Sequence, residues 1–73
     1  MRTLRFHNEI YFSEALDRTE EVFREHAGIE REYREPYSIV VLRAVETGSE
    51  EELAGEFANY ALALTAEQRK AAN

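Results

Sequence analysis

The alternation of apolar and polar residues along this chain predicts three β-strands. Residues 3–7 alternate in character, with Leu4 and Phe6 on one side, which is typical of a half-buried strand. Residues 29–35 alternate charged positions with less polar ones, as in a strand near the edge of a sheet. Residues 39–45 are apolar on both faces, so we expect this strand to occupy the middle of the sheet.

A helix is predicted between the first two strands, and a tight turn between the last two. Apolar residues recur at helical spacing over 14–27, and Ser13 is the expected N-cap. Gly28 is expected to end this helix in the left-handed conformation that glycine adopts readily. Pro36 then favours a turn over 35–38, because its ring fixes φ and it donates no backbone hydrogen bond.

The clearest helix signal lies in residues 49–69. Ser49 and Glu52 have the spacing of a capping box, in which the hydroxyl and the carboxylate each accept a backbone N–H. Gly55 indicates either a close approach of another backbone or a tolerated surface glycine. Leu62 lies outside the main apolar stripe, so the helix has more apolar surface than one sheet face requires. The stripe itself predicts a buried face made of Leu53, Phe57, Tyr60, Ala61 and Leu64.

The order strand, helix, strand, strand, helix predicts an α+β fold in a single domain of residues 1–73. A crossover followed by a hairpin favours a three-stranded antiparallel sheet in the order 1-3-2, with both helices on one face, as in a truncated ferredoxin-like fold. The strand over 3–7 should be an open edge, and an open edge or an uncovered face is what a homodimer or a bound peptide strand would bury. The uncovered face is formed either by Val40, Leu42 and Ala44 or by Ile39, Val41 and Val45.

Composition narrows the function classes. The chain has 73 residues and no cysteine, so neither a disulfide framework nor a cysteine-based zinc site reinforces it. Association with another chain is the remaining common reinforcement of so small a domain. Nine basic and fifteen acidic side chains give a net charge of −6, which argues against direct nucleic-acid binding. No secretory segment or long apolar run is present, so we expect a soluble cytoplasmic protein without membrane contact.

No pattern predicts a catalytic, cofactor or metal site. His7 and His26 lie on different predicted elements, and no further ligands stand at recognisable spacing. The glycines are isolated, which is unlike a phosphate-binding loop. Ser13 and Ser49 are better explained as helix caps than as nucleophiles, and Ser38 adjoins the turn. We therefore expect a protein that is not an enzyme.

Two segments resemble a known family. The segments IYFSEALDRTEEVF and GEFANYALALTAEQR are similar to the strand-to-helix entry and the second helix of HxsD-like small proteins of the His-Xaa-Ser system. The family differs in having a more acidic stretch where this chain has Tyr60 and Ala61, and in continuing beyond Arg69. The resemblance implies a non-enzymatic accessory protein, associated with radical-SAM enzymes that modify ribosomally made peptides. The matching positions are Tyr11, Glu14, Ala15, Glu56, Phe57, Asn59, Leu62 and Arg69.

The leading functional hypothesis is therefore an adaptor that binds a peptide or a partner enzyme through the second helix and an exposed strand. A structural homo-oligomer, such as a dimer, is one alternative. An acidic inhibitor that mimics nucleic acid is another, because both predicted helices carry many carboxylates. Asn59 either contacts solvent at the margin of the apolar stripe or hydrogen-bonds a neighbouring chain or the sheet edge. The candidate partner-binding residues are Glu56, Asn59, Tyr60, Leu62, Arg69, Tyr33 and Tyr37.

Overall fold

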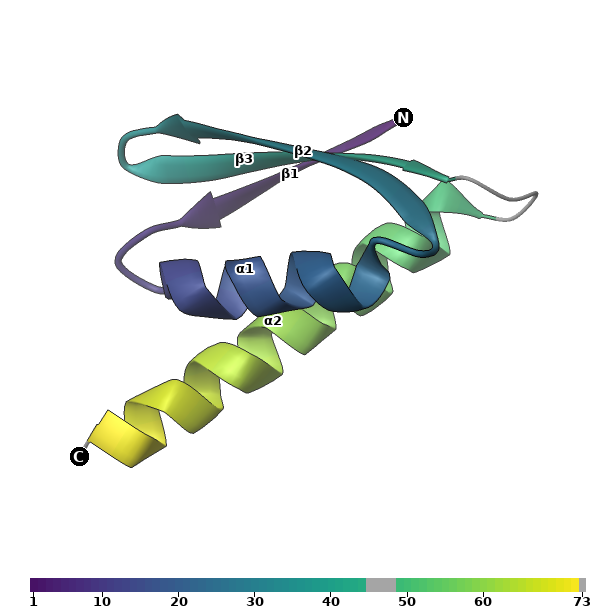
Figure 1. Cartoon of the computed structure of the whole chain (residues 1–73). Coiled ribbons are helices and arrows are strands. Elements are labelled where there is room, and N and C mark those ends of the chain that lie inside the picture. Colours follow the sequence, from purple (N-terminus) through teal and green to yellow (C-terminus); the bar gives the residue numbers. More distant parts are fainter. Residues whose placement is uncertain (45–48, 73) are drawn as a thin grey trace.

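The computed structural model describes residues 1–44 and 49–72, and it confirms the predicted α+β fold and element order (Figure 1). A sheet forms one layer and two helices form the other. The elements are β1 (Arg2–His7), α1 (Ser13–Phe23), β2 (Ala27–Arg34), β3 (Tyr37–Ala44) and α2 (Glu50–Ala72).

The described strands form a sheet in the order β1-β3-β2, as predicted. Strand β3 pairs antiparallel with both neighbours, so β1 and β2 run in the same direction and form the two edges. The register aligns Leu4 of β1 and Arg31 of β2 with Val40 between them. Residues of one such row share a sheet face, because successive side chains on a strand point to opposite faces.

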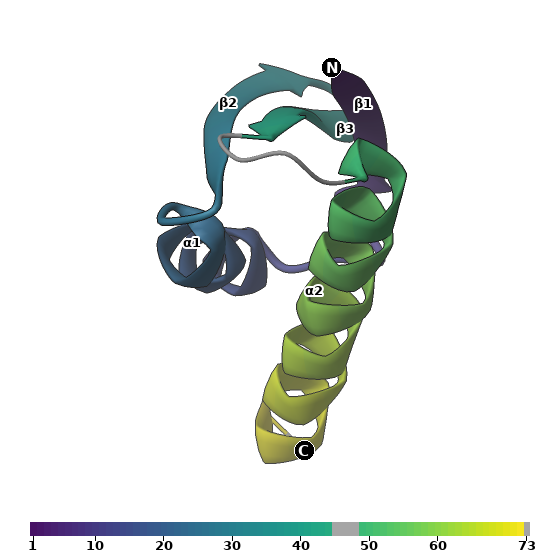
Figure 2. The ribbon, with the colours of Figure 1, turned by 90° about the vertical axis from the view of Figure 1, so that its right-hand side faces the viewer.

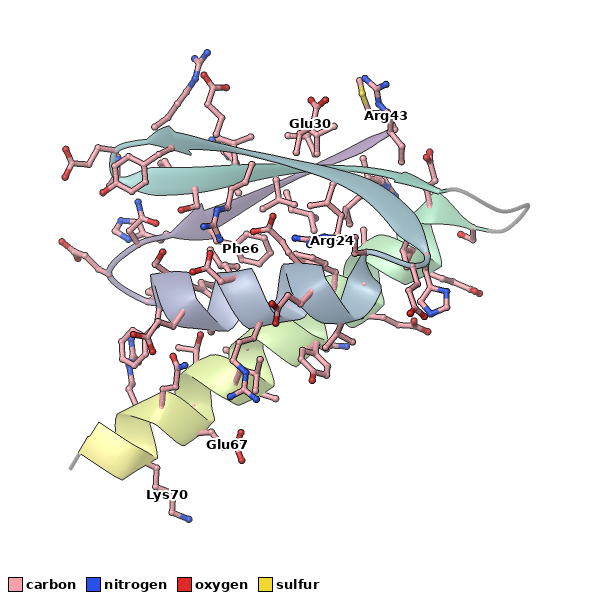
Figure 3. The ribbon with its side chains drawn as sticks, in the orientation of Figure 1. Phe6, Arg24, Glu30, Arg43, Glu67 and Lys70 are labelled. Atoms are coloured by element: carbon pink, nitrogen blue, oxygen red, sulfur yellow. The ribbon has the colours of Figure 1, made fainter. Side chains whose placement is uncertain are left out.

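The helices cover the face that carries Val40 and Leu42, both of which are fully buried. Phe6 lies on this face, between the sheet and the helices (Figure 3). Ile39 and Val41 are only partly buried, so they belong to the uncovered face, which settles the choice between the two predicted sets. Val45 lies outside the described residues.

Aromatic rings fill the space between the sheet and α2. Phe57 is fully buried, and its ring centroid lies 5.4 Å from that of Phe23 and 5.9 Å from that of Phe6. The contact with Phe23 is edge-to-face, a geometry that adds to the stability gained by burying the rings. The predicted stripe places Phe57 and Ala61 correctly in the core, whereas Tyr60 is 38% exposed. Ala54 and Thr65 complete the buried line on α2.

Both predicted boundaries of the first helix are wrong. Ser13 is the first residue of α1, and Phe12 occupies the N-cap position in extended conformation without a side-chain cap. The helix stops at Phe23, because the His26 N–H donates to the Phe23 carbonyl at 2.9 Å and closes a tight turn. Gly28 lies in β2 with a negative φ, since pairing with β3 recruits the residues that helical spacing had assigned to α1.

The predicted start of α2 is confirmed. The Glu52 N–H donates to the Ser49 hydroxyl oxygen at 3.2 Å, which satisfies one of the free amides of the first turn. Gly55 is a tolerated surface glycine, because a Cβ added there would have no heavy atom within 4 Å among the described residues. The amino terminus and Arg2 form ion pairs with Glu50 and Glu51, so β1 is held to the beginning of α2.

Candidate functional site

Four of the predicted partner-binding residues lie on the outer surface of α2. Glu56 and Asn59 are exposed, Leu62 is 49% exposed and Tyr60 is 38% exposed. The helix advances 100° per residue, so Glu56, Asn59 and Leu62 lie about 100° or more around the axis from the buried Phe57. Tyr60 lies only about 60° from Phe57, at the margin of the buried side. Asn59 is exposed, so its amide contacts solvent in the single chain and is accessible to a neighbouring chain.

The outer surface of α2 has two flanks. The Tyr60 ring lies 5.8 Å from the Phe23 ring, so its flank faces α1. Leu62 lies two residues further on, about 160° around the helix axis from Tyr60. The Leu62 flank therefore faces away from α1, and Leu62 is the large apolar side chain there that is exposed among the described residues.

Arg69 makes contacts within the chain. Its guanidinium donates to the carbonyl oxygens of Glu9 and Ile10 at 3.1 Å and 2.7 Å, and it lies 5.5 Å from the centre of the Phe12 ring. The Phe12 N–H donates to the Thr65 hydroxyl oxygen at 3.4 Å. These contacts hold the connection between β1 and α1 against α2, so the structure gives Arg69 a structural role.

Tyr33 and Tyr37 lie on opposite faces of the sheet. Tyr33 is paired with Ser38 on the helix-covered side, but it lies on the edge strand β2 and is 67% exposed. Tyr37 is partly buried on the other face. The Arg5 guanidinium lies 5.3 Å from the centre of the Tyr37 ring, and the His7 ring centroid lies 5.2 Å from it.

The helices divide the candidate residues between two sides of the molecule. Figure 2 shows α2 beneath β1 and α1 beneath β2. The outer surface of α2 therefore adjoins the β1 edge, and Tyr33 belongs to the β2 edge. The two tyrosines of the hairpin and the four residues of α2 do not form one continuous surface.

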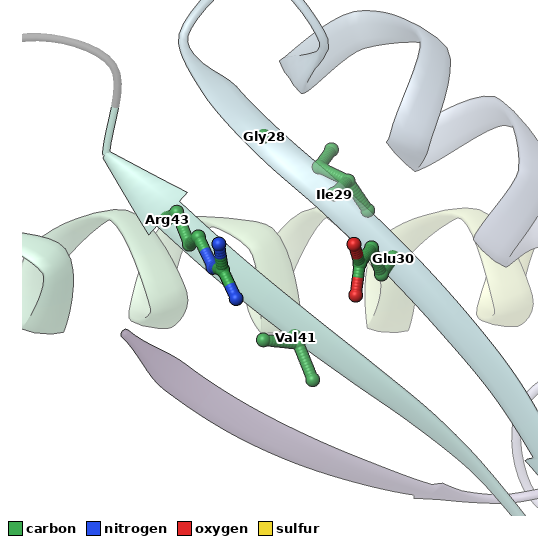
Figure 4. A pocket seen from close by; sticks show the side chains of 5 residues that line it. All are labelled: Gly28, Ile29, Glu30, Val41 and Arg43. Carbon is green, nitrogen blue, oxygen red and sulfur yellow. The ribbon is translucent and has the colours of Figure 1, made fainter.

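The sheet face opposite the helices, which we call the open face, was predicted only as an uncovered surface. Figure 3 shows Glu30 and Arg43 pointing away from the helices on this side. Between them lies a shallow pocket of about 250 Å³, lined by Gly28, Ile29, Glu30, Val41 and Arg43 (Figure 4). Sequence analysis missed this pocket, because the residues come together only through the register of β2 with β3. The open face consists of Thr3, Arg5, His7, Gly28, Glu30, Glu32, Arg34, Tyr37, Ile39, Val41 and Arg43.

The Glu20 carboxyl group lies between α1 and β2 and has a shifted pKa. Burial raises the pKa of Glu20 above its ordinary value, and the nearby Arg31 guanidinium acts in the opposite direction. Arg31 reaches from the helix-covered face of β2 to Asp17 and, at 2.8 Å, to Glu20 of α1. This group joins a strand to a helix and lies away from the outer surface of α2.

Among residues 1–44 and 49–72, no group of three or more histidine, cysteine, aspartate or glutamate side chains is arranged to hold a metal ion. No helix in that part of the chain has the length and hydropathy needed to cross a bilayer. Comparison of the sequence with protein-family models and with curated proteins, and of the structure with solved structures, found no match. The arrangement of residues is therefore the basis for assigning a function.

Proposed function

We propose that this protein is a non-catalytic adaptor that binds a peptide segment or a partner enzyme through the β1 edge and the outer surface of α2. The resemblance to HxsD-like proteins suggests that the partner is a precursor peptide or a radical-SAM enzyme that modifies it. The observation that carries the proposal is the exposure of Leu62 together with Asn59 on the side of the molecule that has an open strand edge.

The chemistry of this surface suits protein recognition. An edge strand presents unpaired backbone N–H and C=O groups to which an extended peptide can add as a further strand. Leu62 supplies apolar area at the same side of the molecule, and Asn59 supplies an amide that can both donate and accept hydrogen bonds. Backbone pairing would provide affinity, while the α2 side chains would select the partner.

The proposal predicts that Leu62→Glu weakens binding to a precursor peptide or radical-SAM enzyme encoded beside this protein. A charge placed in the apolar part of an interface costs about 2 kcal/mol or more, which corresponds to a loss of affinity of about thirtyfold. Titration with a fluorescently labelled peptide, or biolayer interferometry with the enzyme, measures this loss.

Val22→Glu is the matched control, because Val22 is an apolar residue of α1 that is exposed to the same degree as Leu62 and the substitution adds the same charge away from α2. We expect this variant to bind like the wild type. Absence of affinity between the wild-type protein and every such peptide and enzyme would refute the proposed function. Equal losses in the two variants would refute the choice of the Leu62 flank.

A further inference from the structure

The open face carries an ordered pattern of charge across its three strands. One row places Arg5 of β1, Ile39 of β3 and Glu32 of β2 side by side. The next row places Thr3, Val41 and Glu30 in the same order. In these two rows, the β1 side carries the basic Arg5, the centre is apolar and the β2 side is acidic.

We propose that a second copy of this chain packs on the open face, with the twofold axis parallel to β3. This axis places β3 against β3 of the partner, and β1 of each copy against β2 of the other. Arg5 then faces Glu32 across the interface twice, while Ile39 and Val41 meet their own counterparts. The pattern therefore complements itself, as an isologous interface requires.

The other way to pack the two faces around a twofold axis is disfavoured by charge. An axis perpendicular to the strands places β1 against β1 and β2 against β2. Where this axis crosses the row of Ile39, Arg5 would face Arg5 and Glu32 would face Glu32. Like charges in direct opposition destabilise an interface. The charge pattern thus selects the axis parallel to β3.

Neighbouring charges on the open face fit this arrangement. Glu32 forms an exposed ion pair with Arg34 at 3.1 Å, so it has Arg34 on one side and would gain Arg5 of the second copy on the other.

Arg43 lies at the end of the central strand, where the arginines of the two copies come closest. Glu30, which lines the same pocket as Arg43, is the carboxylate that offsets their repulsion.

A second copy is favoured over an unrelated partner because of the charge of this face. Three arginines and two glutamates give it a slightly positive charge, although the chain as a whole has a net charge of −6. Two copies can therefore pack through this face without bringing their acidic helices close to each other. Three strands offer less area than a standard stable interface, so we expect a weak dimer whose population rises with concentration.

The test measures molar mass by sedimentation equilibrium as a function of concentration for the wild type, Arg5→Glu and Glu32→Arg. We expect the wild type to dimerise, and each variant alone to dimerise at least about tenfold more weakly, since both interface contacts become repulsive. An equimolar mixture of the two variants should dimerise like the wild type, because the glutamate introduced in one chain then faces the arginine introduced in the other.

Arg18→Glu and Glu67→Arg are matched controls that make the same charge changes at exposed helix positions, and they should dimerise like the wild type. Circular dichroism checks that every variant is folded. A wild type that stays monomeric to its solubility limit would overturn the inference. Variants that dimerise like the wild type, or a mixture that stays monomeric, would do so as well. The inference is independent of the proposed function, because the dimer leaves the outer surface of α2 free.

Discussion

At the scale of single residues, Phe57 determines how the two layers meet. Its ring is fully buried and contacts the rings of Phe6 and Phe23, so it joins β1, α1 and α2 in one cluster. Helical spacing was enough to predict its burial, because Phe57 and Ala61 recur on one side of a long periodic helix. The same spacing misplaced Tyr60, which lies at the margin of the buried stripe.

Phe57→Ala should destabilise the protein by about 3–5 kcal/mol, because it removes a buried ring and leaves a cavity. This is a large part of the stability of a small domain, so we expect a substantially unfolded population at 25 °C. Urea denaturation followed by circular dichroism measures the loss. Leu62→Ala, at an exposed position, should change the free energy of unfolding by less than about 0.5 kcal/mol. Similar effects of the two substitutions would contradict the assigned core.

Glu20 predicts a dependence of stability on pH. Burial raises the pKa of Glu20 in the folded protein, so the folded state binds the proton more tightly than the unfolded state does. The stabilisation that Glu20 contributes is therefore fully present below the pKa that this carboxyl group has in the unfolded chain. It is lost as pH rises through the pKa that the group has in the folded protein. Relative to Glu20→Gln, the wild type should lose stability as pH rises from the unfolded pKa towards neutrality.

Urea midpoints of the wild type and Glu20→Gln, measured at a series of pH values, test this prediction. Glu14→Gln is the control, because Glu14 is exposed in the first turn of the same helix. A difference between the wild type and Glu20→Gln that stays constant with pH would contradict a raised pKa.

At the scale of elements, α2 is the frame on which the other parts are fixed. Its first turn holds the beginning of β1 through ion pairs, its middle forms the core, and its last turns hold the connection between β1 and α1. The amphipathic pattern predicted the element and its N-terminal cap. It carried no signal for Arg69, because the carbonyl oxygens that Arg69 contacts lie 59 and 60 residues away in the sequence.

The boundaries of α1 show why local signals fail at element ends. Ser13 and Gly28 are ordinary helix-capping residues by type, and their spacing would suit a longer helix. In the structure, tertiary contacts override both signals. The Phe12 amide contacts Thr65 of α2, and Gly28 pairs with Arg43 of β3. The local sequence around each boundary has no information about either partner.

Arg69→Ala should loosen the connection between β1 and α1. The variant loses two hydrogen bonds to backbone carbonyls and the contact with the Phe12 ring, which together contribute about 1–2 kcal/mol at this exposed site. Amide hydrogen exchange, measured by mass spectrometry over residues 8–12, should become several times faster. Lys70→Ala changes the neighbouring exposed cation and should leave this exchange unchanged. Equal exchange in Arg69→Ala and the wild type would contradict the structural role.

At the scale of the whole molecule, one helical layer on a three-stranded sheet leaves separate surfaces available. The order of elements and the apolar central strand were sufficient to predict the topology. They did not predict which surfaces would be continuous, because that depends on the register and on which helix lies under which edge. The structure separates the β1 edge with α2 from the open face, and this separation allows partner binding and dimerisation to be tested independently.

The most direct test of the adaptor proposal is a titration of the isotopically labelled protein with the proposed partner, a precursor peptide or a radical-SAM enzyme, followed by backbone amide NMR. We predict that the largest chemical-shift changes fall on β1 and on residues 56–62, while the amides of Glu30 and Val41 on the open face change little. Changes concentrated on the open face, or no changes with either the peptide or the enzyme, would contradict the proposal.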